Sequence, residues 1–377
     1  MNKTSATGGG KRLIVLSGIN IFRGGTLKIM RDCIAALSGF VDVNTEIIAL
    51  VHNRELYREY PNVRYIAYPR SRKSWLWRLY YEYFGLWRMS KRLNPWCWFS
   101  IHDTTPNVVA QRRMVYCHNS FPFYRLRLRD LFLQPGIAML CLFSYYIYRI
   151  NIHKNDYIIV QQEWFRHELH KFFGIDNIIV SLPDEEDSYL TANASDSVKE
   201  TGVCRFFYPS TPMIHKNIET ACEAAVKLQR YGIGNFELVI TLDGTENRYA
   251  KYIYGKYCGC SAINFTGYLK HDRMQQWYEE CSCLVFPSKV ETWGLPLSEA
   301  KQACKPILVS DLPYARETVG GYDRVRFFNP DDSGELAGLM QQFMEGRLTY
   351  ETIEADEHRM PFARNWNELF QIIMNPS

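Results

Sequence analysis

Short runs of apolar residues recur along the chain, and each is followed by glycine, asparagine or other polar residues. The run Arg12–Ser17 is rich in leucine and β-branched residues and ends at Gly18, which is typical of a strand buried on both faces of a parallel sheet. A helical spacing of apolar residues follows over Thr26–Leu37. Further runs of the strand type lie at Glu46–Val51, Val63–Ala67, Arg113–Cys117 and Tyr157–Val160. This alternation predicts βαβ units in a doubly wound sheet.

The same alternation starts again after residue 202, so the chain contains two series of strands and helices. Runs typical of strands lie at Arg205–Tyr208, Glu237–Leu242, Ile263–Phe265, Cys283–Phe286, Pro306–Val309 and Val325–Phe328. Asn217–Arg230 has the spacing of an amphipathic helix. Two cores suit a chain of 377 residues. We therefore predict an α/β protein with two doubly wound domains, in which ligands bind at a cleft faced by the carboxyl ends of the strands.

Acidic and small polar residues dominate residues 181–202, a composition typical of an interdomain linker. The apolar spacing of Arg359–Met374 predicts a terminal helix that returns to the first domain. The predicted organisation is a flexible leader over residues 1–10, an N-terminal domain over 11–185, a linker over 186–202, a C-terminal domain over 203–358 and a C-terminal helix over 359–377.

Charge is divided unevenly along the chain, although the formal net charge is only +4. Residues 1–180 contain 25 Lys and Arg against 12 Asp and Glu, whereas residues 181–377 contain 19 against 28. The basic half indicates an anionic partner, which can be nucleic acid, acidic lipid or a phosphorylated substrate.

Residues 70–99 mix basic side chains with five tryptophans. This mixture suits the surface of an anionic membrane, and it also suits nucleic acid. A core helix with a solvated basic face is the alternative. The residues predicted to contact a membrane or an acceptor are Arg72, Lys73, Arg78, Arg88, Lys91 and Arg92.

Composition also excludes several classes of protein. The longest apolar stretch, Leu131–Tyr148, is interrupted by polar residues and a proline, and falls short of the ~20 residues of a membrane span. No secretory signal opens the chain. The cysteines show no disulfide framework, and the pairs Cys258/Cys260 and Cys281/Cys283 lack the spacing of zinc sites. We expect a cytoplasmic protein with structural thiols and no metal site.

Candidate ligand-binding residues follow the predicted strands. Gly24 and Gly25 let backbone N–H groups approach a phosphate, and a tight turn without a ligand is the alternative. Lys216 precedes a helix, where an idle lysine is disfavoured by the helix dipole but one that holds an anion is not. His118 follows a strand and can bond a sugar hydroxyl or transfer a proton, while His102 is more typical of a structural histidine.

The stretch PSKVETWGLPLSEA, residues 287–300, combines a strand end, a tight loop and a helix start. Gly294 and Leu295 at the predicted helix N-terminus offer N–H groups to phosphate or sugar oxygens. Glu291 and Glu299 flank them, and each carboxylate can accept hydrogen bonds from a pair of hydroxyls. Because a helical turn fills the gap between the two acids, we predict that they hold a polyol phosphate and do not form a hydrolytic acid pair.

This stretch resembles the E-x7-E region of retaining GT-B glycosyltransferases, in particular glycosyltransferase family 4. The resemblance continues through Phe265–Tyr268, Lys305–Asp311 and Arg316–Glu317, with Tyr208–Asn217 similar to the family's phosphate-binding segment and Gly24–Gly25, Tyr116–Asn119 and Tyr157–Trp164 matching more loosely. It implies the GT-B fold and front-face transfer with retained anomeric configuration. It also implies metal independence, with which the absence of any D-x-D triplet agrees.

Carried over residue by residue, the resemblance implies how a nucleotide sugar is held. Glu291 contacts hydroxyls of the donor sugar, Glu299 holds the ribose, and Lys216 binds the diphosphate. The implied catalytic residues are Glu291, His118 and Lys216. The implied donor contacts are Gly24, Gly25, Ser210, Lys216, Tyr268, Trp293, Gly294, Leu295 and Glu299.

One departure from the family pattern concerns phosphate binding. Ser210 stands where many relatives carry an arginine, so the phosphate charge is left to Lys216, helix N-termini and Arg23. A second departure, Cys304 in place of the family's frequent glycine, is interpreted as a packing change.

The predicted function is retaining transfer of a sugar from a nucleotide sugar to a hydroxyl of a lipid-linked saccharide acceptor, in synthesis of a bacterial surface polysaccharide such as O-antigen, capsule or lipopolysaccharide. We expect no cofactor, no nucleic-acid partner, and peripheral binding to the anionic inner face of the plasma membrane. One alternative is a soluble GT-B transferase with a small or protein acceptor. Another is a non-catalytic module that binds nucleic acid or anionic lipid, although the presence of both glutamates and the lysine favours catalysis.

Overall fold

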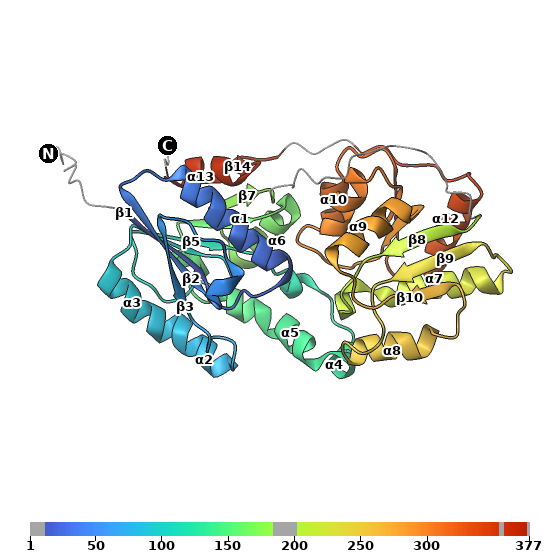
Figure 1. Ribbon diagram of the computed structural model, residues 1–377, viewed down its shortest axis with the longest axis horizontal. Helices are drawn as coiled ribbons and strands as arrows, with labels where there is room; N and C mark the ends of the chain where they lie inside the picture. Colours follow the sequence, from blue (N-terminus) through green and yellow to red (C-terminus); the bar gives the residue numbers. More distant parts are fainter. Residues whose placement is uncertain (1–11, 184–201, 354–357, 375–377) are drawn as a thin grey trace. The chain divides into compact units, whose positions relative to one another are not determined.

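The computed structural model describes residues 12–183, 202–353 and 358–374, and its contacts divide the chain into two compact units (Figure 1). Unit 1 comprises Met1–Asn119, Tyr145–Asp184 and His358–Ser377, and unit 2 comprises Ser120–Ser144 and Glu185–Glu357. The predicted leader and the predicted linker up to residue 201 lie outside the described residues. The segment Ser120–Ser144, which the sequence analysis assigned to the N-terminal domain, groups with unit 2.

Eight parallel strands form the sheet of unit 1. Across the sheet they run β14 (Phe362–Ala363), β7 (Ile178–Ser181), β6 (Tyr157–Val160), β5 (Arg112–Tyr116), β4 (Cys97–Ser100), β1 (Arg12–Gly18), β2 (Thr45–Val51) and β3 (Val63–Ala67). The chain order reverses between β1 and β4, which pair with Val15 opposite Trp98. This is the topological switch point at which ligands of doubly wound sheets bind. Strands β4, β7 and β14 were not predicted from the sequence.

Helices cover both faces of this sheet. Leu16 and Phe99 pack on the face that carries α1 (Gly24–Phe40) and α13 (Trp366–Met374), and Val15 and Trp98 pack on the opposite face beside α3 (Leu86–Leu93). Successive residues of a strand point to opposite faces, so a continuous apolar run serves both layers. The other helical segments of unit 1 are η1 (Arg54–Leu56), α2 (Trp75–Tyr80), the π-helical turn η2 (Tyr81–Gly85), η4 (Ile152–Lys154) and α6 (Glu163–Phe173).

The C-terminal segment differs from its prediction. The helix begins at Trp366, not at Arg359, because Pro361 has no N–H to donate and Phe362–Ala363 pair with β7 as a strand. Trp366 then stacks on Tyr116 with 5.5 Å between ring centroids, so the helix packs within unit 1.

Six parallel strands form the sheet of unit 2, in the order β10 (Ile263–Phe265), β9 (Phe236–Ile240), β8 (Cys204–Tyr208), β11 (Cys283–Phe286), β12 (Ile307–Ser310) and β13 (Val325–Phe328). The prediction of these strands is confirmed to within two residues at each end. The switch point lies between β8 and β11, where Leu284 pairs with Phe207. The helical segments are η3 (Phe121–Phe123), α4 (Leu128–Leu133), α5 (Pro135–Arg149, ending in unit 1), η5 (Ile214–Lys216), α7 (Ile218–Arg230), α8 (Arg248–Tyr257), α9 (His271–Glu280), α10 (Leu295–Gln302), α11 (Pro313–Val319) and α12 (Ser333–Met344).

Polar contacts explain why Ser120–Ser144 belongs to unit 2. The Arg129 guanidinium lies 2.7 Å from the carboxylate of Glu219, a buried residue at the start of α7. The Gln134 side chain donates to the Pro212 carbonyl and accepts from the Ile214 N–H, both at 2.9 Å. Because a buried carboxylate is costly without a partner, Arg129 fastens α4 to the second sheet's helices.

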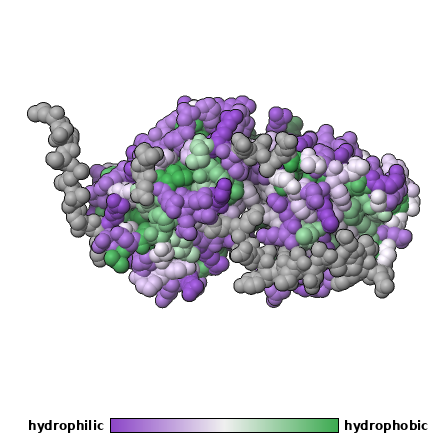
Figure 2. Space-filling view, turned by 90° about the horizontal axis from the view of Figure 1, so that it is seen from above, coloured by the Kyte–Doolittle hydropathy of each residue, from purple (hydrophilic) through white to green (hydrophobic). Residues whose placement is uncertain are grey.

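No helix among the described residues is both long and apolar enough to cross a membrane. Hydrophilic residues predominate on the face of the molecule shown in Figure 2, as expected when the apolar strand residues are packed beneath helices.

The packing of α13 gives a first prediction. Leu369 is fully buried in the core shared with α1, so Leu369→Ala is expected to lower the free energy of unfolding by about 3 kcal/mol through the lost contacts and the cavity left behind. Urea denaturation checks this. Gln371→Ala, on the exposed side of the same helix, is the matched control and is expected to change stability by less than about 0.5 kcal/mol. Equal effects of the two substitutions would contradict the docking of α13.

Candidate functional site

The loops after β8 and β11 lie side by side at the switch point of unit 2. The Asn217 side chain, in a left-handed residue with φ 54°, donates to the carbonyl of Pro287 at 3.1 Å. The Lys289 N–H donates to the His215 carbonyl at 2.8 Å, and the Tyr208 hydroxyl donates to the Lys216 carbonyl at 2.5 Å. These bonds fix the turn that carries Lys216 against the loop that carries Glu291.

Lys216 and Glu291 form an ion pair across these two loops. The Lys216 Nζ lies 2.5 Å from Glu291 Oε1, and the side chains are only 16% and 13% exposed. The ammonium also lies 5.8 Å from the centroid of the Phe286 ring. The two predicted catalytic residues of this domain are therefore brought together, 75 positions apart in sequence. An ammonium such as that of Lys216, close to the N-terminus of a helix, is well suited to hold an anion.

Helix α10 begins as predicted, directly after a left-handed glycine. Gly294 caps the helix with φ 85°, and Leu295 is the first helical residue. The Trp293 indole is buried, and its N–H donates to the Ser298 hydroxyl at 3.0 Å. The backbone carbonyl of Trp293 accepts from the Thr318 hydroxyl. Trp293 therefore supports the loop from inside the protein. At the start of α10, Pro296 has no N–H and the Leu297 N–H donates to the Gly294 carbonyl at 2.8 Å, so the N–H groups that this turn can offer to phosphate oxygens are those of Gly294 and Leu295.

Glu299 is held by a tyrosine that the sequence analysis missed. The buried Tyr278 of α9 donates to Glu299 Oε2 at 2.5 Å. Burial, and then the neighbouring carboxylate, raise the pKa of Tyr278, so it stays a donor at neutral pH. A polar tyrosine in an amphipathic helix carries no sequence signal for such a contact, because the pairing depends on how α9 and α10 pack.

Two other predicted donor contacts differ in their surroundings. Ser210 is buried, and its N–H donates to the Thr241 hydroxyl, whose proton goes to the Ser210 carbonyl, so this residue ties the ends of β8 and β9 together. Tyr268 follows β10 and is 88% exposed. Ser210 thus holds the backbone at the ends of the two strands in place. Tyr268 exposes its ring to solvent at the carboxyl edge of the sheet.

In unit 1, the glycine pair belongs to the first turn of a helix. Helix α1 starts at Gly24, two residues before the predicted start, with Arg23 as its N-cap. The Arg23 and Arg72 guanidinium groups lie 4.9 Å and 3.2 Å from the centroid of the Phe22 ring. Partial burial and the charge of Arg23 lower the pKa of Arg72. Arg72, predicted as a membrane contact, thus lies beside the glycine turn.

His118 has a partner that the sequence analysis did not assign. The His118 Nε2 lies 3.4 Å from Asp103 Oδ2, and its backbone N–H donates to Asp103 Oδ1 at 2.6 Å. Tyr148 also donates to Asp103, at 3.0 Å. The His118 Nδ1 has no hydrogen-bond partner within the described ranges. Asp103 follows β4, a strand absent from the sequence prediction, which is why the pair was missed.

His102 is part of the structure of unit 1, as predicted. Its Nδ1 lies 2.7 Å from the Ser17 carbonyl, and its Nε2 lies 3.5 Å from the buried Glu82 carboxylate. Burial is the main cause of its lowered pKa. Arg78, predicted as a membrane contact, donates to the same carboxylate at 2.8 Å and so neutralises it.

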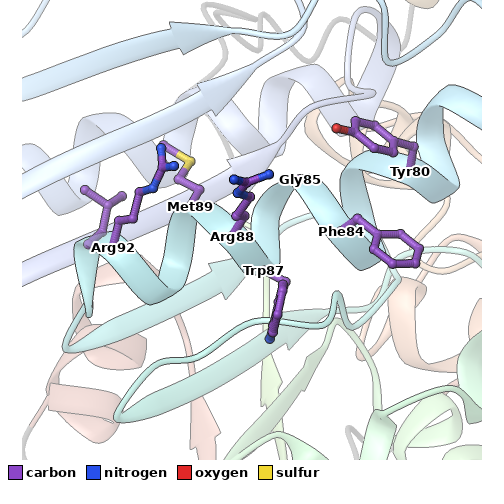
Figure 3. Close-up of a pocket in the computed structure, with 8 residues that line it drawn as sticks. Tyr80, Phe84, Gly85, Trp87, Arg88, Met89 and Arg92 are labelled. Atoms are coloured by element: carbon purple, nitrogen blue, oxygen red, sulfur yellow. The ribbon is translucent and has the colours of Figure 1, made fainter.

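Of the other basic residues predicted to contact a membrane, Arg88 and Arg92 line an open groove along α3. Its volume is about 690 Å³, and it is lined by Tyr80, Phe84, Gly85, Trp87, Arg88, Met89, Arg92 and Leu93 (Figure 3). Lys91 lies 4.0 Å from the Trp87 ring centroid on the same helix. Lys73 is exposed in the turn before α2. The groove therefore combines aromatic walls with two guanidinium groups one helical turn apart.

The described residues contain neither a cluster of metal ligands nor a disulfide. Across residues 12–183, 202–353 and 358–374, no three His, Cys, Asp or Glu side chains are arranged to hold a metal ion. All eleven cysteines are free, and most are buried.

Sequence comparisons relate the chain to known proteins. Residues 199–361 match the family model described as Glycosyl transferases group 1. Serotype-specific mannosyltransferase WbdA of Escherichia coli is 32% identical over 95 residues, which are 25% of this chain and 11% of WbdA. The O-antigen chain mannosyltransferase RfbU of Salmonella typhimurium is 21% identical over 310 residues, or 79% of this chain and 81% of RfbU. The matched part of this chain thus spans about a ninth of the length of WbdA.

Solved structures with a similar arrangement include two lipopolysaccharide glycosyltransferases. The outer core galactosyltransferase WaaB aligns with a TM-score of 0.61 and 13% identity, over 90% of this chain and 92% of WaaB. WaaG, described as involved in lipopolysaccharide biosynthesis, aligns with a TM-score of 0.59 and 11% identity, over 88% and 90%. These likenesses confirm the predicted fold, GT-B with two Rossmann-like domains.

The left-handed cap of α10 gives a second prediction. Gly294→Ala is expected to lower the free energy of unfolding by about 1–2 kcal/mol, because alanine disfavours φ 85°. Its Cβ would also lie 3.3 Å from Leu297 Cδ1. Gly338→Ala, inside α12 with open space around it, is the control and should raise stability by about 0.5–1 kcal/mol. The unfolding midpoint in urea measures both, and a neutral Gly294→Ala would contradict the strained cap.

Proposed function

We propose that the protein is a glycosyltransferase that moves a sugar from a nucleotide-sugar donor to a saccharide acceptor in the synthesis of a bacterial surface polysaccharide. The match of residues 199–361 to the family model described as Glycosyl transferases group 1 supports this proposal. The observation that carries the proposal is the Lys216–Glu291 pair at the switch point of unit 2, beside the N-terminus of α10. The Lys216 ammonium, the Glu291 carboxylate and the N–H groups at the start of α10 lie at the carboxyl edge of one sheet. Together they are complementary to a sugar diphosphate.

The residues of unit 2 divide the donor between them in this proposal. Lys216 and the N–H groups at the start of α10 hold the diphosphate. Glu291 accepts from hydroxyls of the transferred sugar. Glu299, oriented by Tyr278, accepts from the ribose hydroxyls. Tyr268 offers an exposed ring to the base.

The reaction proposed is front-face transfer with retained anomeric configuration. The bond from the anomeric carbon to the diphosphate oxygen breaks as the acceptor hydroxyl oxygen bonds to that carbon, and the hydroxyl proton goes to an oxygen of the leaving diphosphate. Lys216 and the α10 N–H groups stabilise the charge that develops on that diphosphate, which is usually the largest catalytic term. His118, oriented by Asp103, is proposed to contact the transferred sugar. No metal ion is assigned a role, because these positive groups occupy its place in the scheme.

Mannose is the first sugar to test, because WbdA and RfbU are named as mannosyltransferases. A thermal-shift screen of GDP-mannose, UDP-glucose, UDP-galactose and dTDP-rhamnose distinguishes the donors, since a ligand stabilises the folded state in proportion to its occupancy. A non-catalytic lipid-binding module, the alternative function, would show no shift with any of them.

The third prediction concerns Lys216. Lys216→Ala is expected to lower kcat for sugar transfer about 10²–10³-fold, because it removes a preorganised cation from the leaving group. Transfer from radiolabelled nucleotide sugar measures the effect. Lys251→Ala, on the exposed side of α8, is the control and should leave kcat unchanged. Full activity in Lys216→Ala would overturn the assignment.

We also propose that the acceptor is lipid-linked and that the protein binds peripherally to the anionic inner face of the plasma membrane. Large apolar side chains on α2 and η2 are exposed, among them Trp75, Leu76, Leu79, Tyr80 and Phe84. The one acidic side chain of this segment, Glu82, is buried and paired with Arg78. An exposed apolar surface beside Lys73, Arg88, Lys91 and Arg92 is complementary to acidic lipid headgroups. The groove in Figure 3 is a place where a lipid phosphate can meet Arg88 and Arg92.

A fourth prediction tests this surface. The protein is expected to float with vesicles that contain acidic phospholipid and not with purely zwitterionic vesicles. Leu76→Glu, at a side chain 77% exposed, should abolish flotation, because a carboxylate is repelled by acidic headgroups. Tyr231→Glu, at a side chain 72% exposed in unit 2, is the control and should float as before. Failure to float with either kind of vesicle would favour the soluble alternative, in which the acceptor is a small molecule or a protein. Equal flotation with both kinds would refute recognition of acidic headgroups.

A further inference from the structure

The Lys216–Glu291 pair is held in place by the backbone around it. Asn217 binds its turn to the Pro287 carbonyl, and Lys289 binds the Glu291 loop to the His215 carbonyl. The two charges therefore meet at 2.5 Å across loops that these hydrogen bonds fasten to each other. A ligand that takes either charge must separate it from the other.

Separating the pair leaves a carboxylate in unfavourable surroundings. Among the described residues, Glu291 is the one acidic side chain within 4.0 Å of the Lys216 Nζ, and Lys216 is the one basic side chain within that distance of Glu291. The charge of Glu291 adds to burial in raising the pKa of both Tyr208 and Tyr314, two fully enclosed phenols. Glu291 thus lies against the low-dielectric interior, where an unpaired carboxylate is expensive.

The two classes of ligand differ in what they offer Glu291. A nucleoside diphosphate takes Lys216 with its phosphate oxygens, brings its own negative charge close to Glu291, and offers no donor in exchange. A nucleotide sugar takes Lys216 in the same way but places sugar hydroxyls where they can donate to Glu291. A charge-assisted hydrogen bond to a carboxylate compensates most of what the broken ion pair loses.

We propose that the Lys216–Glu291 pair makes this site select diphosphates that carry a sugar over free nucleoside diphosphates. The inference rests on the proposed function, in which Lys216 takes the diphosphate and Glu291 the sugar. Once the sugar has been transferred, Glu291 has lost its hydroxyl partner and competes with the product diphosphate for Lys216. The same pair that admits the donor therefore promotes release of the product.

The test compares two pairs of ligands on three proteins by isothermal titration calorimetry. GDP-mannose and GDP are the probes, with UDP-galactose and UDP measured in parallel. In the wild type, the sugar nucleotide is expected to bind about tenfold more tightly than the matching diphosphate. Glu291→Gln, which keeps the shape but cannot pair with an ammonium charge, should tighten the free diphosphate several-fold and weaken the sugar nucleotide. The ratio of the two affinities should then fall at least about tenfold.

Glu299→Gln is the matched control, because the ribose is common to both ligands. It is expected to weaken the sugar nucleotide and the free diphosphate alike and to leave their ratio unchanged. Product inhibition provides a second readout, since the inhibition constant of the free diphosphate should fall in Glu291→Gln. A merely structural role for Glu291 would weaken both ligands together. If Glu291→Gln does not fold, Glu291→Asp, which withdraws the carboxylate by one methylene, must shift the ratio in the same direction.

The outcomes separate this inference from the function on which it rests. If the wild type binds neither sugar nucleotide nor either diphosphate, the proposed function fails. If it binds them and Glu291→Gln leaves the affinity ratio at its wild-type value, or lowers both affinities equally, selection by the pair is refuted while the transferase stands.

Discussion

The chain's candidate chemistry depends on how two neighbouring parallel strands end. In unit 2, β8 and β11 lie side by side although 74 residues separate the end of one from the start of the other, and the loops that follow them must diverge to opposite faces of the sheet. Asn217 prevents the loops from separating further, because its side chain spans from one to the carbonyl of Pro287 and on to that of Pro330. Its own backbone is left-handed, a conformation that asparagine tolerates better than most residues. The ion pair and the opening of α10 follow from this fixed geometry.

Much of the fold was predictable because it depends on strands buried on both faces. Such strands must be apolar throughout, so Cys283–Phe286 is visible in the sequence as an uninterrupted run with the bounds it has in the structure. β4 was not predicted because its run, Cys97–Ser100, follows directly on Asn94-Pro95-Trp96 within the basic, tryptophan-rich residues 70–99. β14 has two residues, and each pairs with a β7 residue 182 positions away in sequence.

The residues of the candidate site were predictable where a local motif carried them, and their partners were not. Glu291, Glu299 and Lys216 occupy positions where strand, turn and helix signals coincide. Tyr278 and Asp103, which orient Glu299 and His118, belong to other elements and are brought close only by packing. The basic segment shows the same limit. Composition indicated a charged surface, but only the structure distinguishes Arg72 at Phe22 and Arg78 at Glu82 from the exposed Arg88 and Arg92.

Helix α4 belongs to unit 2 although it precedes the other segment of that unit, Glu185–Glu357, in the sequence. This arrangement matters when the second half of the chain is expressed alone. A polypeptide that starts at residue 202 would contain all six strands of the second sheet but would lack Arg129 and Gln134. Glu219 would then be a buried carboxylate without its guanidinium partner, and the Ile214 N–H, two residues before Lys216, would lose its acceptor. An isolated C-terminal half is therefore not an independent donor-binding module. If it fails to bind a donor, the cause is the missing helix α4 and not the missing unit 1.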